Sequence, residues 1–147
     1  MSHPISKTDY IRWRECRKDA WLAIHNPELY YSYEPSAFEL ALQETGAEVE
    51  EIARRLFSDG VFVWGHDKAA HDQTHTLIDE KTPTIFQAVF LVDGFLAVAD
   101  VLKFNIETGG FTIYEIKSAS HMKKEYLYDV AFQVMLLDRC GLKIDQA

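Results

Sequence analysis

Two apolar runs with a turn signal between them constrain the fold of this chain more than any other feature. The first run, TIFQAVFLV, covers residues 84–92, and the second, FLAVADVLKF, covers residues 95–104. Asp93-Gly94 lies between them, and Asp-Gly between two apolar runs is typical of a two-residue β-hairpin turn. Because both runs are almost continuously apolar, we expect these strands to lie in a sheet that is covered on both faces.

Helical patterns and two further strands surround this hairpin. The sequence predicts helices over residues 6–25, 36–57, 67–81 and 121–141, and strands over residues 61–64 and 111–117. Ser6 is a candidate N-cap, and Ser36 and Glu39 form the Ser-x-x-Glu pattern of a capping box. The second helix carries an apolar stripe that consists of Phe38, Leu42, Val49, Ile52, Ala53 and Leu56. The expected fold class is α/β, with helices flanking the sheet.

Length and composition fit a single domain over residues 1–147, which can also be the N-terminal part of a longer protein. Apolar runs stay well short of the ~20 residues that a membrane helix needs. Cys16 and Cys140 are too few for a disulfide scaffold or a complete cysteine metal site, so a cytoplasmic location is expected. The net charge of −8 argues mildly against a protein that coats nucleic acid. Basic residues nevertheless gather in two places, near the N-terminus and around residues 117–124.

The strand over residues 111–117 has charged residues where its pattern predicts apolar ones. Phe111, Ile113, Glu115 and Lys117 follow one another at intervals of two residues, so all four point to the same face of the sheet. If residue 104 pairs with residue 111 across the preceding turn, then Asp100 lies directly opposite Glu115. Two such carboxylates repel each other unless a cation lies between them or one is protonated, which favours a divalent metal site.

Lys117 is placed to hold or activate a water molecule beside such a metal and to balance charge on a phosphate. The alternative is structural: Asp100 and Glu115 could form ordinary ion pairs with Lys103, Lys117 or an arginine at the end of the sheet. The spacing alone leaves both interpretations open.

The same residues resemble a known family. Asp100, followed after fourteen residues by Glu115-Ile116-Lys117, resembles the D…(D/E)-x-K signature of the PD-(D/E)XK nuclease superfamily. The segment ISKTDYIRWRECRKDAWL is similar to the N-terminal segment of RecB-like and Cas4-like nucleases, and especially of the bacterial family DUF2779. GAEVEEIARRLFSDGV, IFQAVFLVDGFLAVADVL and EIKSASHMKKEYLYDVAFQVMLLDRCGL continue this resemblance in the same order over nearly the whole chain.

The resemblance implies a restriction-endonuclease-like core, in which helices flank a mixed four-stranded sheet and a metal lies where the sheet splits. It implies a metal-dependent nuclease that hydrolyses DNA phosphodiester bonds with Mg²⁺ or Mn²⁺. Asp100, Glu115, Glu50 and the backbone carbonyl of Ile116 would be the metal ligands. Lys117, together with Asp100 and Glu115, would be catalytic.

Two further positions follow from the resemblance. Gly46 begins the G-x-x-V-(H/E) element of these nucleases, which puts Glu50 at the metal-binding position; by helical angle Glu50 lies at the edge of the apolar stripe. Gln133 interrupts the apolar face of the last helix, where related nucleases have Q-x-x-x-Y and the glutamine contacts the active site or DNA. Leu137 replaces that tyrosine, so a core role for Gln133 stays open. Gln87 also points inward by alternation.

The expected partner is DNA, single- or double-stranded, with Gln133, Lys123 and Lys124 as substrate-binding residues. A catalytically degenerate domain that binds nucleic acid or a protein is the alternative, and a small-molecule phosphohydrolase is a third interpretation. His71 and His75 have the i, i+4 spacing of a zinc pair, but no glutamate follows the first histidine as in H-E-x-x-H.

Cys16 matches the first cysteine of the Cas4-like nucleases that carry an iron–sulfur cluster. Such a cluster needs three further cysteines, and Cys140 is the other one in the chain. We therefore expect no iron–sulfur cluster in this chain.

Overall fold

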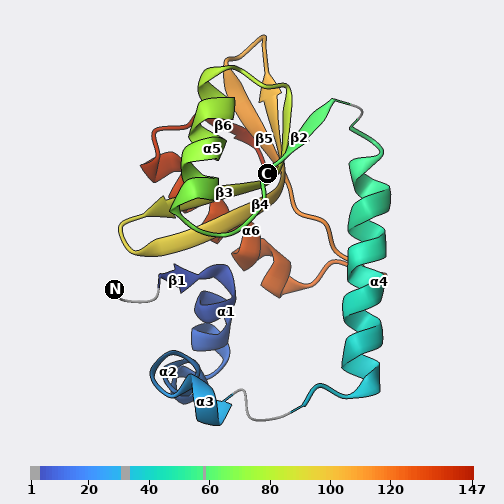
Figure 1. Ribbon diagram of the computed structural model, residues 1–147, viewed down its shortest axis with the longest axis vertical. Helices are drawn as coiled ribbons and strands as arrows, with labels where there is room; N and C mark the ends of the chain where they lie inside the picture. The colour runs from blue at the N-terminus through green and yellow to red at the C-terminus, as the bar shows by residue number, and fades with distance from the viewer. Residues whose placement is uncertain (1–3, 31–33, 58) are drawn as a thin grey trace.

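The protein is an α/β structure with one mixed six-stranded sheet between helices (Figure 1). The computed structural model describes residues 4–30, 34–57 and 59–147, without the side chains of Glu39, Leu42 and Gln43. The strands are β1 (Ile5–Ser6), β2 (Gly60–Phe62), β3 (Thr84–Val92), β4 (Phe95–Asn105), β5 (Gly110–Tyr114) and β6 (Ile144–Gln146). The helices are α1 (Lys7–Glu15), α2 (Arg17–His25), α3 (Pro27–Tyr30), α4 (Ala37–Arg54), α5 (Lys68–Asp79) and α6 (Lys124–Arg139).

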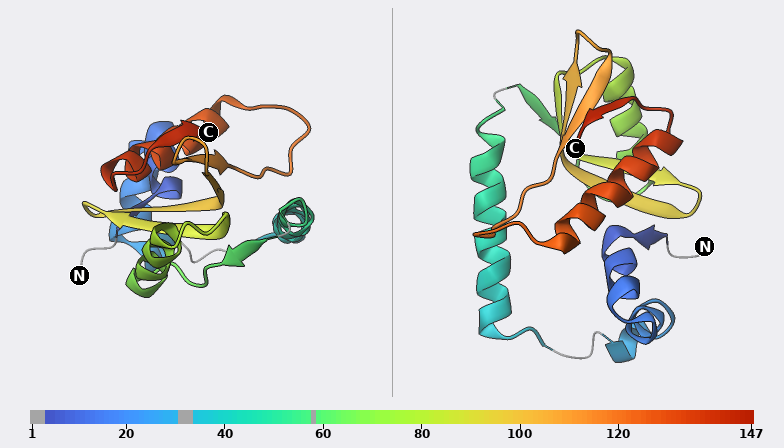
Figure 2. Two further views of the ribbon diagram at one scale, coloured as in Figure 1. Left: turned by 90° about the horizontal axis from the view of Figure 1, so that it is seen from above. Right: turned by 180° about the vertical axis from the view of Figure 1, so that it is seen from behind.

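The hairpin predicted from the two apolar runs is confirmed. β3 and β4 are antiparallel, and the turn residues Asp93 and Gly94 both have positive φ angles, of 52° and 80°. A two-residue turn of this kind suits the right-handed twist of the two strands. α5 covers one face of the sheet and α6 the other (Figure 2), so the expected coverage of both faces is also confirmed. Residues such as Ile85 and Val89 are consequently fully buried.

The predicted register between β4 and β5 is confirmed, with Phe104 opposite Phe111. The ladder ends at Tyr114, however, three residues before the expected end of the strand. The reason is a change of partner: the backbone N–H of Ile116 donates to the Asp100 carboxylate at 2.8 Å. The Asp100 side chain of β4 thereby accepts the N–H that would otherwise pair with a backbone carbonyl of β4.

The sheet has six strands, and the expectation of four is wrong. The four expected strands correspond to β2, β3, β4 and β5 in the order of the chain. β1 and β6 have two and three residues, which is too short for an alternating pattern to be visible in the sequence. β1 is held by backbone pairing, parallel to the start of β4 with Ile5 opposite Phe95.

The first predicted helix consists of two helices in the structure. Ser6 caps α1 as expected, but the chain is extended at Cys16 (φ −151°, ψ 109°) before α2 begins. Tyr10 of α1 stacks on Phe132, while Ala20 of α2 is buried against other parts of the protein. In one continuous helix Tyr10 and Ala20 would be ~80° apart around the axis, so the break allows each to reach its own contact.

α4 stands beside the rest of the molecule (Figure 1) and is held mainly near its C-terminal end. Phe57, just beyond the helix, contacts the rings of Phe86 and Tyr114 with centroids 6.3 and 5.1 Å apart. The predicted apolar stripe is largely exposed, since Phe38 and Leu56 are 71% and 80% exposed. Parts of the predictions for this helix lie outside the described residues: the side chains of Leu42 and Glu39 and the expected stop at Ser58.

Within the part of the chain that the structure describes, no helix has both the length and the apolar character of a membrane span.

We predict that Gly60→Ala destabilises the fold, because a Cβ atom at Gly60 would lie 1.9 Å from the ring of Phe86. A forced shift of a packed ring typically costs about 1–3 kcal/mol in the free energy of unfolding, measured here by urea denaturation. Gly46→Ala is the matched control, since its Cβ would meet nothing within 4 Å and alanine favours a helix by up to ~1 kcal/mol. Equal effects of the two substitutions would contradict the packing described for β2.

Candidate functional site

The candidate site lies where β5 leaves β4. Asp100 is near the middle of β4, and its Oδ2 accepts the hydrogen bond from the Ile116 backbone. Its Oδ1 accepts a longer bond of 3.4 Å from the side chain of Gln87. Asp100 therefore has one oxygen firmly held and one with only a weak partner. The ladder between β4 and β5 ends one pair before Asp100 and Glu115, and the charge of Glu115 is close enough to raise the pKa of Asp100.

Glu115 lies on the buried face of the sheet end, as its alternation with Ile113 predicts, and its side chain is only 5% exposed. Its Oε1 is 2.6 Å from the ammonium of Lys7 and 2.7 Å from that of Lys117. Its Oε2 accepts a hydrogen bond of 2.6 Å from the amide of Gln133. A buried carboxylate is stable only with such partners, and Glu115 has three.

Lys117 bridges two acids. Its ammonium is 2.7 Å from Glu115 and 2.7 Å from Asp129 of α6, which is buried. Burial lowers the pKa of this lysine, but the hydrogen bonds to Asp129 and Glu115 outweigh it and raise the pKa above its ordinary value. Lys117 is therefore an ammonium group at neutral pH. It can donate hydrogen bonds and stabilise negative charge, but it cannot take a proton from water.

The two carboxylates that face each other differ in their ionisation. Burial, together with the negative charge of Glu115, raises the pKa of Asp100 to about 6. Burial also raises the pKa of Glu115, but Lys7, Lys117 and Gln133 outweigh it and hold the pKa below its usual value. Glu115 thus has two ion-pair partners, whereas Asp100 forms no ion pair among the described residues. The hydrogen bond from Ile116 and the charge of Lys7 lower the pKa of Asp100 less than burial and Glu115 raise it.

Glu50 reaches the site through Gln87. The Gln87 side chain donates to Glu50 Oε1 at 2.7 Å and more weakly to Asp100, so one amide connects the two acids. Gln87 has a positive φ of 54°, which is uncommon for a residue other than glycine in a strand, and such strain often occurs at functional sites. Glu50 is also paired with Arg54 at 3.1 Å, whereas the side chain of the neighbouring Glu51 is 61% exposed.

Gln133 is fully buried in α6 and makes the contact with Glu115. Its Oε1 has no hydrogen-bond partner among the described residues. A buried acceptor without a partner is costly, and in proteins a bound water molecule or ion commonly satisfies such a group. Leu137, at the position where the resemblance predicts a tyrosine, is fully buried in the core.

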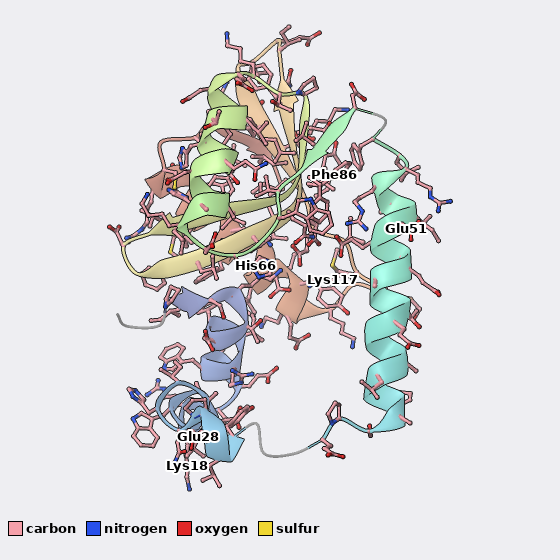
Figure 3. The ribbon with its side chains drawn as sticks, in the orientation of Figure 1. Lys18, Glu28, Glu51, His66, Phe86 and Lys117 are labelled. Atoms are coloured by element: carbon pink, nitrogen blue, oxygen red, sulfur yellow. The ribbon has the colours of Figure 1, made fainter. Side chains whose placement is uncertain are left out.

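The predicted substrate residues Lys123 and Lys124 are exposed at the start of α6, outside the buried cluster of acids. A pocket of about 530 Å³ lies beside the site and is lined by Glu115, Lys117 and Tyr126, among others. The Lys117 ammonium is 5.4 Å from the centre of the Tyr126 ring. Figure 3 shows Lys117 near the middle of the molecule, far from the labelled residues of α2 and α3. The Lys117 ammonium and the Tyr126 ring therefore both line the pocket beside the site.

Two members of this cluster, Lys7 and Asp129, are not among the site residues predicted from the sequence. A signal for Asp129 exists, because it lies four residues before Gln133 and so shares the apolar face of α6. Lys7 gives no such signal, since it is separated from Glu115 by 108 residues and meets it only in the folded chain. Alternation predicts that Gln87 points inward, but it does not predict the bonds of Gln87 to two acids.

Within the described ranges, the histidines and cysteines considered from the sequence form no cluster of interacting side chains as large as the one around Glu115. His71 uses its Nδ1 to accept the backbone N–H of Leu91, and its ring is 4.4 Å from that of His75. Cys16 and Cys140 are free.

Among the residues that the structure describes, no three His, Cys, Asp or Glu side chains are grouped closely enough to hold a metal ion. Gln87 links Glu50 to Asp100, and Asp100 also accepts the backbone N–H of Ile116, the residue after Glu115.

No known family model matches this chain, and no curated protein matches it.

We predict that Asp100→Asn stabilises the protein at high pH but not at low pH. The pKa of Asp100 in the folded protein, about 6, exceeds the ~4 of an exposed aspartate, so the wild type loses stability as pH rises through this interval. Relative to the wild type, the variant should gain about 1–3 kcal/mol in the free energy of unfolding between pH 4 and pH 8. Urea denaturation in the presence of a chelator measures this, and a difference that does not change with pH would contradict the assignment.

Proposed function

We propose that this chain is a metal-dependent nuclease domain with a restriction-endonuclease-like core, which hydrolyses phosphodiester bonds of DNA. The observation that carries the proposal is the approach of Asp100 and Glu115 at the point where β5 leaves β4, with the Lys117 ammonium 2.7 Å from Glu115. Two acids from neighbouring strands and one adjacent amine are the groups that the D…(D/E)-x-K resemblance implies.

No three described His, Cys, Asp or Glu side chains form a metal-binding group, so a divalent cation here would be held by one or two carboxylates and a backbone carbonyl and would keep several water ligands. Asp100 is a desolvated acid whose charged form is disfavoured by Glu115, and a cation between the two would remove that repulsion. Its Oδ1 has a partner at 3.4 Å, so this oxygen keeps lone-pair capacity for a ligand role. Glu115 or Glu50, together with the Ile116 carbonyl, would complete the protein ligands, with water and a phosphate oxygen, as Mg²⁺ and Mn²⁺ prefer.

When bound, the metal would lower the pKa of a water molecule and polarise a phosphoryl oxygen. The water oxygen would bond to phosphorus and release a proton to the solvent, the bond from phosphorus to the leaving sugar oxygen would break, and that oxygen would receive a proton from the solvent. The products are a phosphate monoester and a free hydroxyl group. The protein contributes orientation and electrostatic stabilisation, which are the main requirements of phosphoryl transfer.

In this proposal Lys117 acts as a fixed positive charge. Because its pKa is raised by Asp129 and Glu115, it stays protonated throughout and donates a hydrogen bond to the attacking water or to a phosphate oxygen. Asp129 and Gln133 hold Lys117 and Glu115 in place and are positioning residues. The lysine is thus expected to stabilise the developing negative charge of the transition state rather than to act as a base.

The preference for a nucleic acid rests on the resemblance, with two supporting features. The pocket beside Lys117 includes Tyr126, and an aromatic ring next to a cation suits a nucleobase and its phosphate. Exposed lysines at the start of α6, Lys123 and Lys124, can attract the backbone in spite of the negative net charge.

A second function deserves a test because of one observation. Both oxygens of Glu115 already have protein partners, which is the arrangement expected of a catalytically degenerate domain that binds nucleic acid or a protein. In that case the cluster would be a structural ion network, and the chain would bind DNA or a partner without cleaving it.

We predict that the wild type cleaves labelled DNA with Mn²⁺ or Mg²⁺ and that Lys117→Met lowers the rate at least about a hundredfold. Single-stranded DNA, double-stranded DNA, RNA and a small phosphodiester are compared, with and without a chelator, to identify the substrate class. Methionine keeps most of the volume of lysine and removes the charge. Lys68→Met is the matched control, since Lys68 is 80% exposed on α5 and pairs with Asp72.

The thermal melting temperature of each variant shows whether it is folded. Equal, metal-independent background from the wild type and Lys117→Met, combined with unchanged DNA binding, would favour the degenerate domain and overturn the nuclease proposal. Cleavage of the small phosphodiester alone would instead indicate a phosphohydrolase.

A further inference from the structure

Lys7 joins the candidate site from the opposite end of the sequence, and local structure fixes its position. It is the first residue of α1, and Ser6 caps this helix through a reciprocal pair of hydrogen bonds with Asp9. β1 pairs with the start of β4, where Ile5 lies opposite Phe95. The Lys7 side chain is 22% exposed and its ammonium lies 2.6 Å from Glu115 Oε1. A strand pair and a helix cap thus place one more cation beside the proposed metal ligand.

The oxygens of Glu115 have few lone-pair positions left to bind a metal ion. A carboxylate offers about four lone-pair positions, two on each oxygen. Lys7 and Lys117 both donate to Oε1, and Gln133 donates to Oε2. Only one position on Oε2 remains for a metal ion. A cation that uses Glu115 more fully must therefore displace a lysine.

The two lysines are not equally held. The Lys117 ammonium is 2.7 Å from both Glu115 and Asp129. Moving it away from Glu115 would therefore break the ion-pair bridge between these two acids. Lys7 has one close acid, and Asp129 Oδ2 lies 4.0 Å from its ammonium. Lys7 is the partner that can leave Glu115 at lower cost, and Asp129 is within reach as its next partner.

We propose that Lys7 is a displaceable internal cation of the metal site: when a divalent ion binds Asp100 and Glu115, the Lys7 ammonium moves from Glu115 to Asp129. This inference rests on the proposed function, since it takes Glu115 as a metal ligand. Lys7 neutralises Glu115 until the metal replaces it, and it lowers the affinity for the metal. Because Lys7 begins α1, metal binding is coupled to the position of the N-terminal helix.

The test compares Mn²⁺ binding to the wild type, Lys7→Met and Lys18→Met by isothermal titration calorimetry at pH 8. Removal of a positive charge in contact with a ligand oxygen should tighten Mn²⁺ binding by about tenfold in Lys7→Met. Lys18→Met is the matched control, because Lys18 is exposed on α2, far from Lys117 (Figure 3), and its substitution should leave the affinity unchanged. This readout needs no activity.

Equal or weaker Mn²⁺ binding by Lys7→Met, with binding by the wild type intact, overturns the displacement and leaves the proposed function standing. Failure of the wild type to bind Mn²⁺ at millimolar concentration overturns the proposed function, and the inference with it. If Lys7→Met does not fold, the wild type itself gives the answer by NMR of the lysine Nζ groups. Saturating Mg²⁺ should shift the Lys7 resonance, assigned with Lys7→Arg, and an unchanged resonance overturns the inference.

Discussion

The buried charge of Glu115 is the constraint on which the rest of this structure depends. An ionised carboxylate with a side chain only 5% exposed would be costly alone, and the protein provides two ammonium groups and an amide for it. These partners come from α1, from the segment after β5 and from α6. The cluster therefore ties three separate parts of the chain together at one end of the sheet, and loss of any one charge would leave another uncompensated.

The charges of this cluster also make the two facing acids differ in their ionisation. Lys7 and Lys117 balance Glu115 and Asp129, so these four side chains form a neutral group. Asp100 lies next to this group, and its burial, together with the negative charge of Glu115, raises its pKa. In the proposed function, an acid of this kind would gain most from a divalent ion. Lys117 would be a fixed charge in the same proposal.

The parts of the site that lie on one hairpin could be predicted from the sequence. The turn between β4 and β5 fixes the register, and the alternation of residues fixes the face, so the approach of Asp100 and Glu115 followed from local rules. Lys7 could not be predicted, because its contact depends on the pairing of a two-residue strand with β4. The break at Cys16 and the exposed stripe of α4 were missed for a related reason: tertiary packing, not helical periodicity, decides them.

X-ray diffraction from crystals soaked in Mn²⁺ would show whether these two acids share an ion. We expect an anomalous peak within about 2.5 Å of oxygens from both Asp100 and Glu115, with Lys117 still bonded to Asp129. A peak confined to surface carboxylates, or none at all while both lysines stay on Glu115, would contradict a shared metal site.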